Sequence, residues 1–442
     1  MAKRKAAEQA QNVQAMKGDT SWFVHDRFGM FIHWGLYAMA ARHEWVRHNE
    51  KIPNEVYDRK YFKRFDPDLY NPDLWAKAAA DAGMKYFVIT TKHHEGFCLW
   101  DTKLTDYKAP NTPAGRDLLK PMIEAFRRHG LKVGLYHSLI DWRHPQYTID
   151  PHIGPYRDRP AEERAKMNAT RSMERYAEYL HGQTRELLTM FGKIDILWYD
   201  FSYPKPDGTG KGRDDWQSEK LVKMIRKLQP DVILDDRLDL PGVGDIKTPE
   251  QVQPRQWPAV DGKPAVWEAC QTFSGSWGYH RDESSWRDTD ELIRTLIDCV
   301  SKGGNLLLNV GPTARGEFDE RAMTRLKGIG EWMRRHSRSV YGCTQAPEGF
   351  TCPENCKLTY NSVKKRLYVH VLAWPYKHLW LDGKAYTEQV EYAQLLHDAS
   401  EVHMRIDGSQ GGQAVAGKES LCITLPQSKP NAAIPVIELF LK

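Results

Sequence analysis

The feature that most constrains this chain is a regular alternation of short apolar runs with amphipathic segments. Over about 300 residues, runs rich in β-branched and aromatic residues are each followed by helical patterns of roughly 10 to 15 residues. Such alternation is typical of parallel strands joined by helices. No G-x-G-x-x-G follows the first predicted strand, which disfavours a dinucleotide-binding sheet. We therefore expect an α/β fold of the (β/α)8-like TIM-barrel type.

The individual elements are predicted from periodicity and from the glycines and prolines that bound them. The predicted strands cover residues 28–34, 86–91, 132–136, 193–200, 232–234, 265–267 and 305–310. The predicted helices cover residues 72–82, 118–129, 160–190, 221–228, 291–300 and 321–335.

The pattern changes near residue 341 to short β-type segments separated by turns, of which Asp382-Gly383 and Asp407-Gly408 are examples. This spacing predicts an all-β unit of about 100 residues, and we expect a sandwich. The predicted domains are therefore a catalytic barrel over residues 1–342 and a C-terminal β-sandwich over residues 343–442.

Charge and cysteine content exclude several function classes. The chain has 63 basic and 58 acidic residues, a net charge of +5, and charges this mixed argue against a nucleic-acid surface. The basic cluster Lys3-Arg4-Lys5 is interpreted as a solvated tail. Seven cysteines contain no C-x-x-C pair, so no metal site is predicted from them, Cys352 and Cys356 included.

No membrane partner is expected, because no apolar run approaches the roughly 18 residues of a membrane span. The segment Met1 to Gly18 lacks the apolar core of a signal peptide. The chain as it stands is expected in the cytoplasm, or in the periplasm or outside the cell if a leader has been removed. A homo-oligomer is compatible with the sequence.

A carboxylate ends the predicted strand 193–200, which reads K-I-D-I-L-W-Y-D. A charged side chain at the end of a buried strand is costly unless it has partners or a task. In β/α barrels, chemistry is carried out at the C-terminal ends of the strands. These considerations predict that Asp200 is a catalytic nucleophile.

A second carboxylate would be needed for glycoside hydrolysis, which usually uses two. The other candidates at strand ends or in the following loops are Asp235, Asp236, Glu250 and Glu268. Asp235 and Asp236 precede Arg237, and at least one of them is expected to be a structural partner of its guanidinium. Spacing alone leaves the choice between Glu250 and Glu268 open.

Histidines follow several of the predicted strands, namely His33, His93, His94 and His137. Two interpretations compete: neutral hydrogen-bonding partners for sugar hydroxyls, or metal ligands. The first strand lacks a H-x-H pair, which disfavours the metal. The 15 Trp and 20 Tyr residues favour a sugar, because proteins grip the apolar faces of sugar rings with flat side chains.

Several motifs along the chain carry a family resemblance. They are F-G-M-F-I-H-W-G at 28–35, H-E-W at 43–45, T-K-H-H-E-G-F-C-L-W-D at 91–101, D-I-L-W-Y-D at 195–200, S-W-G-Y at 276–279 and G-G-N-L-L-L-N-V-G-P at 303–312. In this order and spacing, the chain resembles the α-L-fucosidases of glycoside hydrolase family 29.

The resemblance implies a retaining exo-glycosidase that releases terminal α-L-fucose from a fucosylated oligosaccharide or glycoconjugate without a cofactor. It implies that Asp200 is the nucleophile. The acid/base of the family lies in a loop of variable length, and the motif Thr248-Pro249-Glu250 assigns it to Glu250. Glu268, in a W-E pair, is the runner-up.

The resemblance also implies a fucose pocket made of hydrogen-bonding and aromatic side chains. Its members are His33, Glu44, Trp45, His93, His94, Tyr136, Trp198, Arg237 and Trp277. Two departures from the family pattern, His137 and His48, are expected at the rim, where they would affect the preferred leaving group. A non-catalytic fucose-binding barrel and a metal-dependent barrel hydrolase remain as alternatives.

Overall fold

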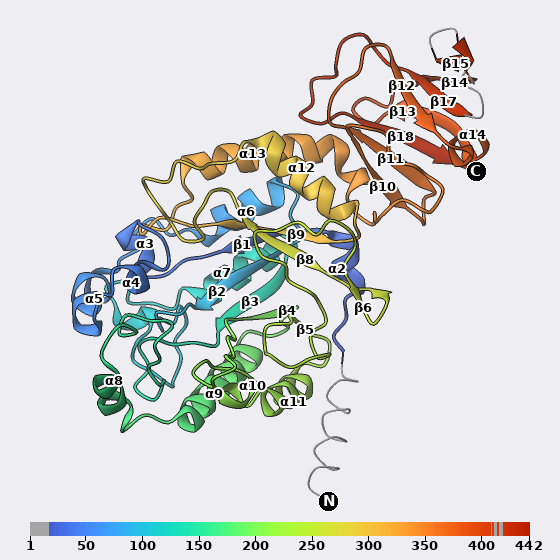
Figure 1. Ribbon diagram of the computed structural model, residues 1–442. Coiled ribbons are helices and arrows are strands. Elements are labelled where there is room, and N and C mark those ends of the chain that lie inside the picture. The colour runs from blue at the N-terminus through green and yellow to red at the C-terminus, as the bar shows by residue number, and fades with distance from the viewer. Residues whose placement is uncertain (1–16, 408, 411–412, 415–418) are drawn as a thin grey trace, which may run out of the picture.

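The computed structural model describes residues 17–407, 409–410, 413–414 and 419–442 (Figure 1). The predicted lead-in at residues 1–16, with Lys3-Arg4-Lys5, lies outside them. The centre is a curled parallel sheet with the strand order β5-β4-β3-β2-β1-β9-β8. Its strands are β1 (Phe28–Ile32), β2 (Tyr86–Lys92), β3 (Lys132–Ser138), β4 (Ile196–Asp200), β5 (Ile233–Leu234), β8 (Glu268–Thr272) and β9 (Asn305–Val310).

Helices follow most of these strands and cover the outer face of the sheet (Figure 1). They are α2 (Ser21–Asp26), α3 (Tyr37–Ala40), α4 (Val46–Asn49), α5 (Asn54–Lys60), α6 (Pro72–Asp81), α7 (Leu119–Arg128), α8 (Ala161–Asn168), α9 (Met173–Met190), α10 (Arg213–Trp216), α11 (Ser218–Leu228), α12 (Thr289–Val300) and α13 (Glu320–His336). Short 3-10 turns lie at Phe62–Arg64, Ala109–Asn111 and Ser337–Ser339. No helix in the described ranges is long and apolar enough to cross a membrane.

Side chains alternate between the two faces of the sheet, as expected for strands. On β1, Phe28, Met30 and Ile32 pack outward against the helices. Phe31 points inward and joins a second cluster with residues from the other strands of the sheet: Tyr86, Val88, Tyr136, Ile196, Trp198, Ile233, Cys270 and Leu307. Because one face of the sheet encloses its own apolar core, the sheet must curl.

Residues 245–251 span the gap between the edge strands β5 and β8. The amide of Asp245 donates to Leu234 O of β5 at 2.8 Å, and the amide of Cys270 in β8 donates to Pro249 O at 3.1 Å. Ile246 contributes its side chain to the inner apolar cluster. This segment, called here the closing segment, therefore satisfies backbone groups of both edge strands.

The C-terminal residues form two antiparallel sheets, with strand orders β10-β11-β18-β13 and β12-β17-β14. The strands are β10 (Cys356–Asn361), β11 (Arg366–Val371), β12 (His378–Asp382), β13 (Val390–Leu395), β14 (His403–Asp407), β17 (Ser420–Thr424) and β18 (Val436–Leu441). The C-terminal region also contains helix α14 (Lys384–Gln389) and the hairpin β15–β16 (Ser409–Gln410, Gln413–Ala414). Another hairpin, β6–β7 (Ala259–Val260, Lys263–Pro264), lies earlier in the chain, between β5 and β8. Inward residues of both large sheets share one apolar core, separate from those of the parallel sheet.

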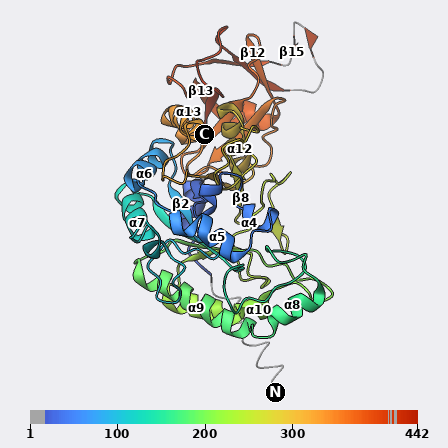
Figure 2. The same ribbon diagram turned by 90° about the vertical axis from the view of Figure 1, so that its left-hand side faces the viewer.

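The two regions are joined through α12 and α13, which lie beside the C-terminal strands in both views (Figures 1 and 2). The indole of Trp332 in α13 donates a 2.8 Å hydrogen bond to Ile434 O. The ammonium of Lys357 in β10 lies 2.7 Å from the carboxylate of Asp298 in α12. Trp332 is 4% exposed and belongs to the same apolar cluster as Ile434 and Val436, so the contact also buries apolar surface.

The expected α/β class and the antiparallel C-terminal region are observed, but one predicted strand is misplaced and one predicted helical region is divided. The strand predicted at 265–267 is β8, which begins at Glu268. Its polar residues concealed it, although every residue of β8 is buried. The helical region predicted over 160–190 contains two helices, α8 and α9, because the Ser172 hydroxyl caps a new helix by accepting from the amide of Arg175.

We expect Trp332→Ala to lower the free energy of unfolding by about 3–5 kcal/mol, since it removes a buried indole between the two regions. Trp332→Phe should cost less because it keeps a ring in the site. Denaturant unfolding at fixed pH measures both. Val363→Ala is the control, because Val363 is 93% exposed and should change stability by less than about 0.5 kcal/mol. A loss for Trp332→Ala no larger than the control's would contradict the interpretation.

Candidate active site

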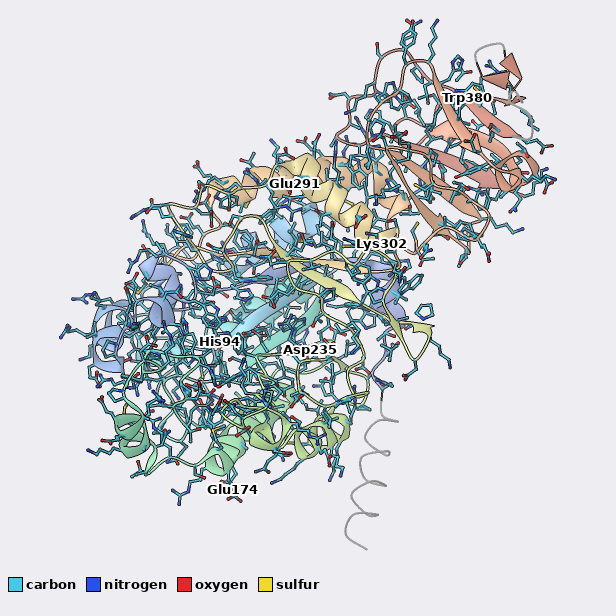
Figure 3. All side chains as sticks on the ribbon, viewed as in Figure 1. His94, Glu174, Asp235, Glu291, Lys302 and Trp380 are labelled. Carbon is cyan, nitrogen blue, oxygen red and sulfur yellow. The ribbon has the colours of Figure 1, made fainter. Side chains whose placement is uncertain are left out.

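A cavity opens at the C-terminal ends of the parallel strands. It is lined by Phe31, His33, Trp45, His93, His94, Tyr136, Trp198, Asp200, Phe201, Arg237, Glu250, Cys270 and Trp277. Of the eleven residues predicted for catalysis or binding, only Glu44 is missing from this lining. Figure 3 shows His94 in the part of the molecule that contains the parallel sheet, far from Trp380 in the C-terminal sheets.

Asp200 is the last residue of β4, and its side chain is 14% exposed. One carboxylate oxygen accepts from the Tyr136 hydroxyl at 2.8 Å, and the other accepts from the Arg237 guanidinium at 3.0 Å. Burial raises the pKa of Asp200, while the nearby Arg237 charge opposes that rise. The strand end therefore presents a carboxylate that is largely desolvated and held by two donors.

Glu250 enters the cavity from the closing segment. Its carboxylate accepts from Arg237 Nη1 at 2.7 Å, the same nitrogen that donates to Asp200. One nitrogen bonded to both groups keeps their nearest oxygens closer than the roughly 6.5–9.5 Å carboxyl separation of inverting glycosidases. The Glu250 side chain is 42% exposed, so it lies on the solvent side of Asp200.

Arg237 is itself fixed by contacts that use its remaining nitrogens and its flat face. Its Nε donates to the Thr248 hydroxyl at 3.1 Å, and its Nη2 donates to Thr248 O at 3.0 Å. The guanidinium lies over the Trp198 ring at 4.6 Å, a favourable cation–π arrangement. Thr248, two residues before Glu250, therefore connects the arginine to the closing segment.

The aspartates before Arg237 do not hydrogen-bond its guanidinium directly, but both are linked to it, Asp235 through the Arg237 charge and Asp236 through Thr248. The Asp236 carboxylate instead accepts from the amide and the hydroxyl of Thr248, at 3.2 and 2.8 Å. Asp235 is buried and accepts from the amide of Tyr199 at 3.2 Å. Burial raises the pKa of Asp235 well above its usual range. Asp236 thus acts on Arg237 only through Thr248.

The cavity histidines are neutral, because burial lowers the pKa of His33 to about 3 and those of His93 and His94 well below their usual value. The Ser138 hydroxyl donates to Ile140 O, so it accepts from His94 Nδ1 at 2.7 Å. This tautomer leaves His94 Nε2, 3.7 Å from the Asp200 carboxylate, as an acceptor.

His33 is oriented in the same way. The Asn309 amide nitrogen donates to Trp277 O, so its oxygen accepts from His33 Nδ1 at 2.6 Å. His33 Nε2 is then an acceptor as well. Two such acceptors in a buried cavity suit hydroxyl donors. Within the described residues, no three His, Cys, Asp or Glu side chains are grouped so as to hold a metal ion.

Aromatic rings form the remaining walls. Tyr136 and Trp198 stack at 5.7 Å, and Phe31 contacts Trp198 at 5.3 Å and Trp277 at 5.9 Å. Phe31 was not predicted as a site residue. Strand alternation could have identified it, because Phe31 and His33 are two residues apart and therefore share a face.

Glu44 is absent from the residues that line the cavity. It is 1% exposed, and one carboxylate oxygen accepts from the amides of Trp277 and Gly278, at 3.1 and 2.8 Å. Burial raises the pKa of Glu44 to about 7. The structure therefore places this carboxyl where it positions the Trp277 backbone.

Two other residues lie away from their expected places. Glu268, the runner-up acid/base, begins β8 and so lies at the opposite end of the sheet, where its buried carboxyl accepts from the Tyr86 hydroxyl at 2.5 Å. His137, expected at the rim, is fully buried and bonds Thr91. It neighbours Tyr136 on β3, so strand alternation turns it to the opposite face.

The cavity combines two carboxylates held close together with neutral histidines and aromatic walls, and it lies at the strand ends of an α/β sheet. This is the arrangement of a glycoside hydrolase. Comparisons with known proteins identify the family of glycoside hydrolases. The model of the family described as alpha-L-fucosidase matches residues 1–338. The chain belongs to the α-L-fucosidase family, which confirms the resemblance predicted from the motifs.

Individual relatives agree with this assignment. The tissue alpha-L-fucosidase of Bos taurus is 30% identical over 381 residues, covering 80% of this chain and 75% of the relative. Alpha-L-fucosidase isoenzyme 1 from Paenibacillus thiaminolyticus has a TM-score of 0.87 at 43% identity, covering 98% of this chain and 100% of the other.

A Bacteroides thetaiotaomicron family 29 alpha-L-fucosidase, described as a covalent intermediate trapped with 2-fluoro-fucosyl fluoride, has a TM-score of 0.80 at 28% identity. The match covers 95% of each chain.

We expect Glu268→Gln to flatten the pH dependence of stability. Burial raises the pKa of Glu268 from 4.5 to about 8, so the folded protein binds an extra proton between these values and wild type loses stability as the pH rises through them. Glutamine keeps an acceptor for Tyr86 but has no proton to lose. The free energies of unfolding at pH 5 and pH 8 should differ more in wild type than in Glu268→Gln, by an amount on the order of a few kcal/mol. Equal differences in both proteins would exclude a buried, titrating Glu268.

Proposed function

We propose that this chain is a retaining exo-α-L-fucosidase in which Asp200 is the nucleophile and Glu250 is the acid/base. Its substrate is a terminal α-L-fucosyl unit of an oligosaccharide or glycoconjugate. The observation that carries the proposal is the Arg237 nitrogen bonded at 3.0 Å to Asp200 and at 2.7 Å to Glu250. Retaining glycosidases need a close pair of carboxyl groups, about 5–5.5 Å apart, because one of them attacks the sugar directly.

The environments of the two carboxyl groups support different tasks. Asp200 lies deeper, with donors on both oxygens, and can approach the anomeric carbon of a sugar in the cavity. Glu250 is the more exposed group. It lies on the side from which a leaving group departs and water enters, as an acid/base must.

In the first step, an Asp200 oxygen bonds to the anomeric carbon while the glycosidic C–O bond breaks. Protonated Glu250 gives its proton to the departing oxygen. The product of this step is a fucosyl-aspartate ester and a glutamate. Arg237 contacts both side chains, so it stabilises the negative charge on Asp200 before the step and on Glu250 after it.

In the second step, Glu250 takes a proton from a water molecule as the water oxygen bonds to the anomeric carbon. The ester bond to Asp200 breaks, and the aspartate regains its charge. Two inversions at the same carbon release fucose with its original α configuration.

The fucose pocket follows from the cavity walls. His33 and His94 would accept hydrogen bonds from ring hydroxyls through Nε2, and the His93 ring contacts both of them, at 5.6 and 4.0 Å. Phe31, Tyr136, Trp198 and Trp277 would cover the deoxy methyl group and the apolar ring face. Glu44 would act on the pocket through Trp277.

The finer architecture is part of the proposal. Hydrogen bonds from the closing segment to β5 and β8 support a closed (β/α)8-like barrel. The shared core of the two antiparallel sheets supports a β-sandwich. We place the domain boundary at residues 342 and 343, after which Thr344 begins the contacts with β10.

We expect Asp200→Ala and Glu250→Ala each to lower kcat on an aryl α-L-fucoside by at least about 10²-fold. Azide should rescue both variants but give different products. Without the nucleophile, azide attacks the substrate directly and yields the β-fucosyl azide. Without the acid/base, azide attacks the ester and yields the α-fucosyl azide. Product analysis by NMR decides, and near-normal activity of either variant would overturn that residue's role.

We expect Arg237→Met to shift the acidic limb of the kcat/KM profile to higher pH. The guanidinium lowers the pKa of Asp200 against the effect of burial, so without it the nucleophile ionises only at higher pH. The value of kcat/KM at the optimum should fall about 10²-fold or more. Arg321→Met is the matched control, since Arg321 also bonds an aspartate, Asp319, and covers a tryptophan ring outside the cavity. An unshifted acidic limb would contradict the assignment.

A further inference from the structure

The lysine directly before the two cavity histidines has no part in the proposed chemistry. It belongs to the motif T-K-H-H-E-G at 91–96, in which His93 and His94 line the cavity and Lys92 does not. The Lys92 side chain is 0% exposed, and a buried ammonium is costly unless it has partners. The motif therefore contains a buried cation outside the cavity, next to the residues that form its wall.

A register shift between β2 and β3 changes the direction of the side chains just before the histidines. Thr90 lies opposite Tyr136, whereas Lys92 lies opposite His137. Tyr136 lines the cavity and His137 has the opposite orientation. Since partners in neighbouring strands share a face, Lys92 turns outward instead of following Thr90 inward. Irregularities of this kind re-aim side chains next to active sites, and here His93 returns to the cavity side.

On the outer side of the sheet, Lys92 is surrounded by a carboxylate and two tyrosines. Its ammonium donates to the Asp141 carboxylate at 3.4 Å and to the Tyr176 hydroxyl at 3.3 Å. The ammonium also lies 5.6 and 5.4 Å from the ring centroids of Tyr176 and Tyr179 in α9, a cation–π arrangement. The Asp141 side chain is 2% exposed. Lys92 and Asp141 therefore form a buried ion pair, in which loss of either partner leaves the other charge uncompensated.

Asp141 belongs to the loop that holds the backbone of His94. The second oxygen of its carboxylate accepts from the amides of Arg143 and His144, at 2.9 and 2.8 Å. Within the turn that these bonds fix, the amide of Trp142 donates to the His94 carbonyl at 2.8 Å. The ion pair therefore joins the strand before the histidines to the loop that supports them afterwards.

We propose that Lys92 is a positioning residue for His93 and His94, acting through its ion pair with Asp141. This inference rests on the proposed function, in which the cavity histidines bind the hydroxyls of fucose. The pair holds Lys92 outward, so the next residue turns toward the cavity. A regular register would instead turn His93 away from it. Neither charged group lines the cavity, so the pair acts on the sugar only through the histidines.

Double-mutant cycles with the histidines test this role. The readout is the factor by which Lys92→Met lowers kcat/KM on an aryl α-L-fucoside, in wild type and in the His93→Ala and His94→Ala backgrounds. In wild type we expect a loss of about tenfold or more, because misplacement of a binding group by about 1 Å can cost about 10²-fold. The loss should be smaller by more than about twofold in at least one background, where the ring that Lys92 positions is missing.

A merely structural role would give the same loss in every background. Losses that agree within about twofold in wild type and in both histidine variants would therefore overturn the proposal. So would a kcat/KM of Lys92→Met equal to that of wild type. If the unpaired Asp141 charge prevents Lys92→Met from folding, as judged by circular dichroism, Lys92→Met combined with Asp141→Asn takes its place under the same criteria. That combination leaves no unpaired charge and keeps an acceptor for the amides of the loop.

Lys211→Met is the matched control. Lys211 is 4% exposed, bonds the Asp150 carboxylate at 2.6 Å and lies 4.7 Å from the Tyr147 ring centroid, but these partners lie in loops that carry no cavity histidine. Its effect on kcat/KM should agree within about twofold in the three backgrounds. Failure of the wild-type protein to hydrolyse the aryl α-L-fucoside would overturn the proposed function itself, whereas additive cycles would overturn only the role of Lys92.

Discussion

The site depends on one cation shared by two carboxylates. Without Arg237, Asp200 and Glu250 would repel each other in a partly desolvated cavity, where such repulsion is strong. With it, the pair is held close, and in the proposed mechanism one guanidinium accompanies the negative charge as it moves between them. Trp198 beneath the guanidinium and Thr248 beside it limit its freedom. In the proposed mechanism, this geometry is therefore preorganised before the sugar binds.

The same strand alternation that builds the core also delivers the site. Inward side chains of the strands enclose an apolar interior. The next inward positions, at or just beyond the strand ends, carry polar groups such as His33 and Asp200. Burial keeps the histidines neutral, so they act as hydrogen-bond acceptors. The low polarity that stabilises the fold thus also determines the chemistry available in the cavity.

Much of the site was predictable because strand ends can be read from short apolar runs. Asp200, His33, His93 and His94 follow such runs directly, and the family motifs added the aromatic walls. Positions that depend on partners distant in sequence were harder to predict. Glu44 turned out to hold the Trp277 backbone, and Glu268 lies at the opposite end of its strand because β8 begins later than its apolar neighbours suggested.

The sequence by itself determined the order of strands and helices, the family and the carboxylate at the end of β4, because these depend on local patterns of apolar and polar residues. Only the tertiary structure decided that Glu250 shares a nitrogen with Asp200, that Asp236 acts through Thr248, and that Lys92 pairs with Asp141. Such pairings are made by loops whose paths depend on long-range contacts, for which local sequence carries no periodic signal.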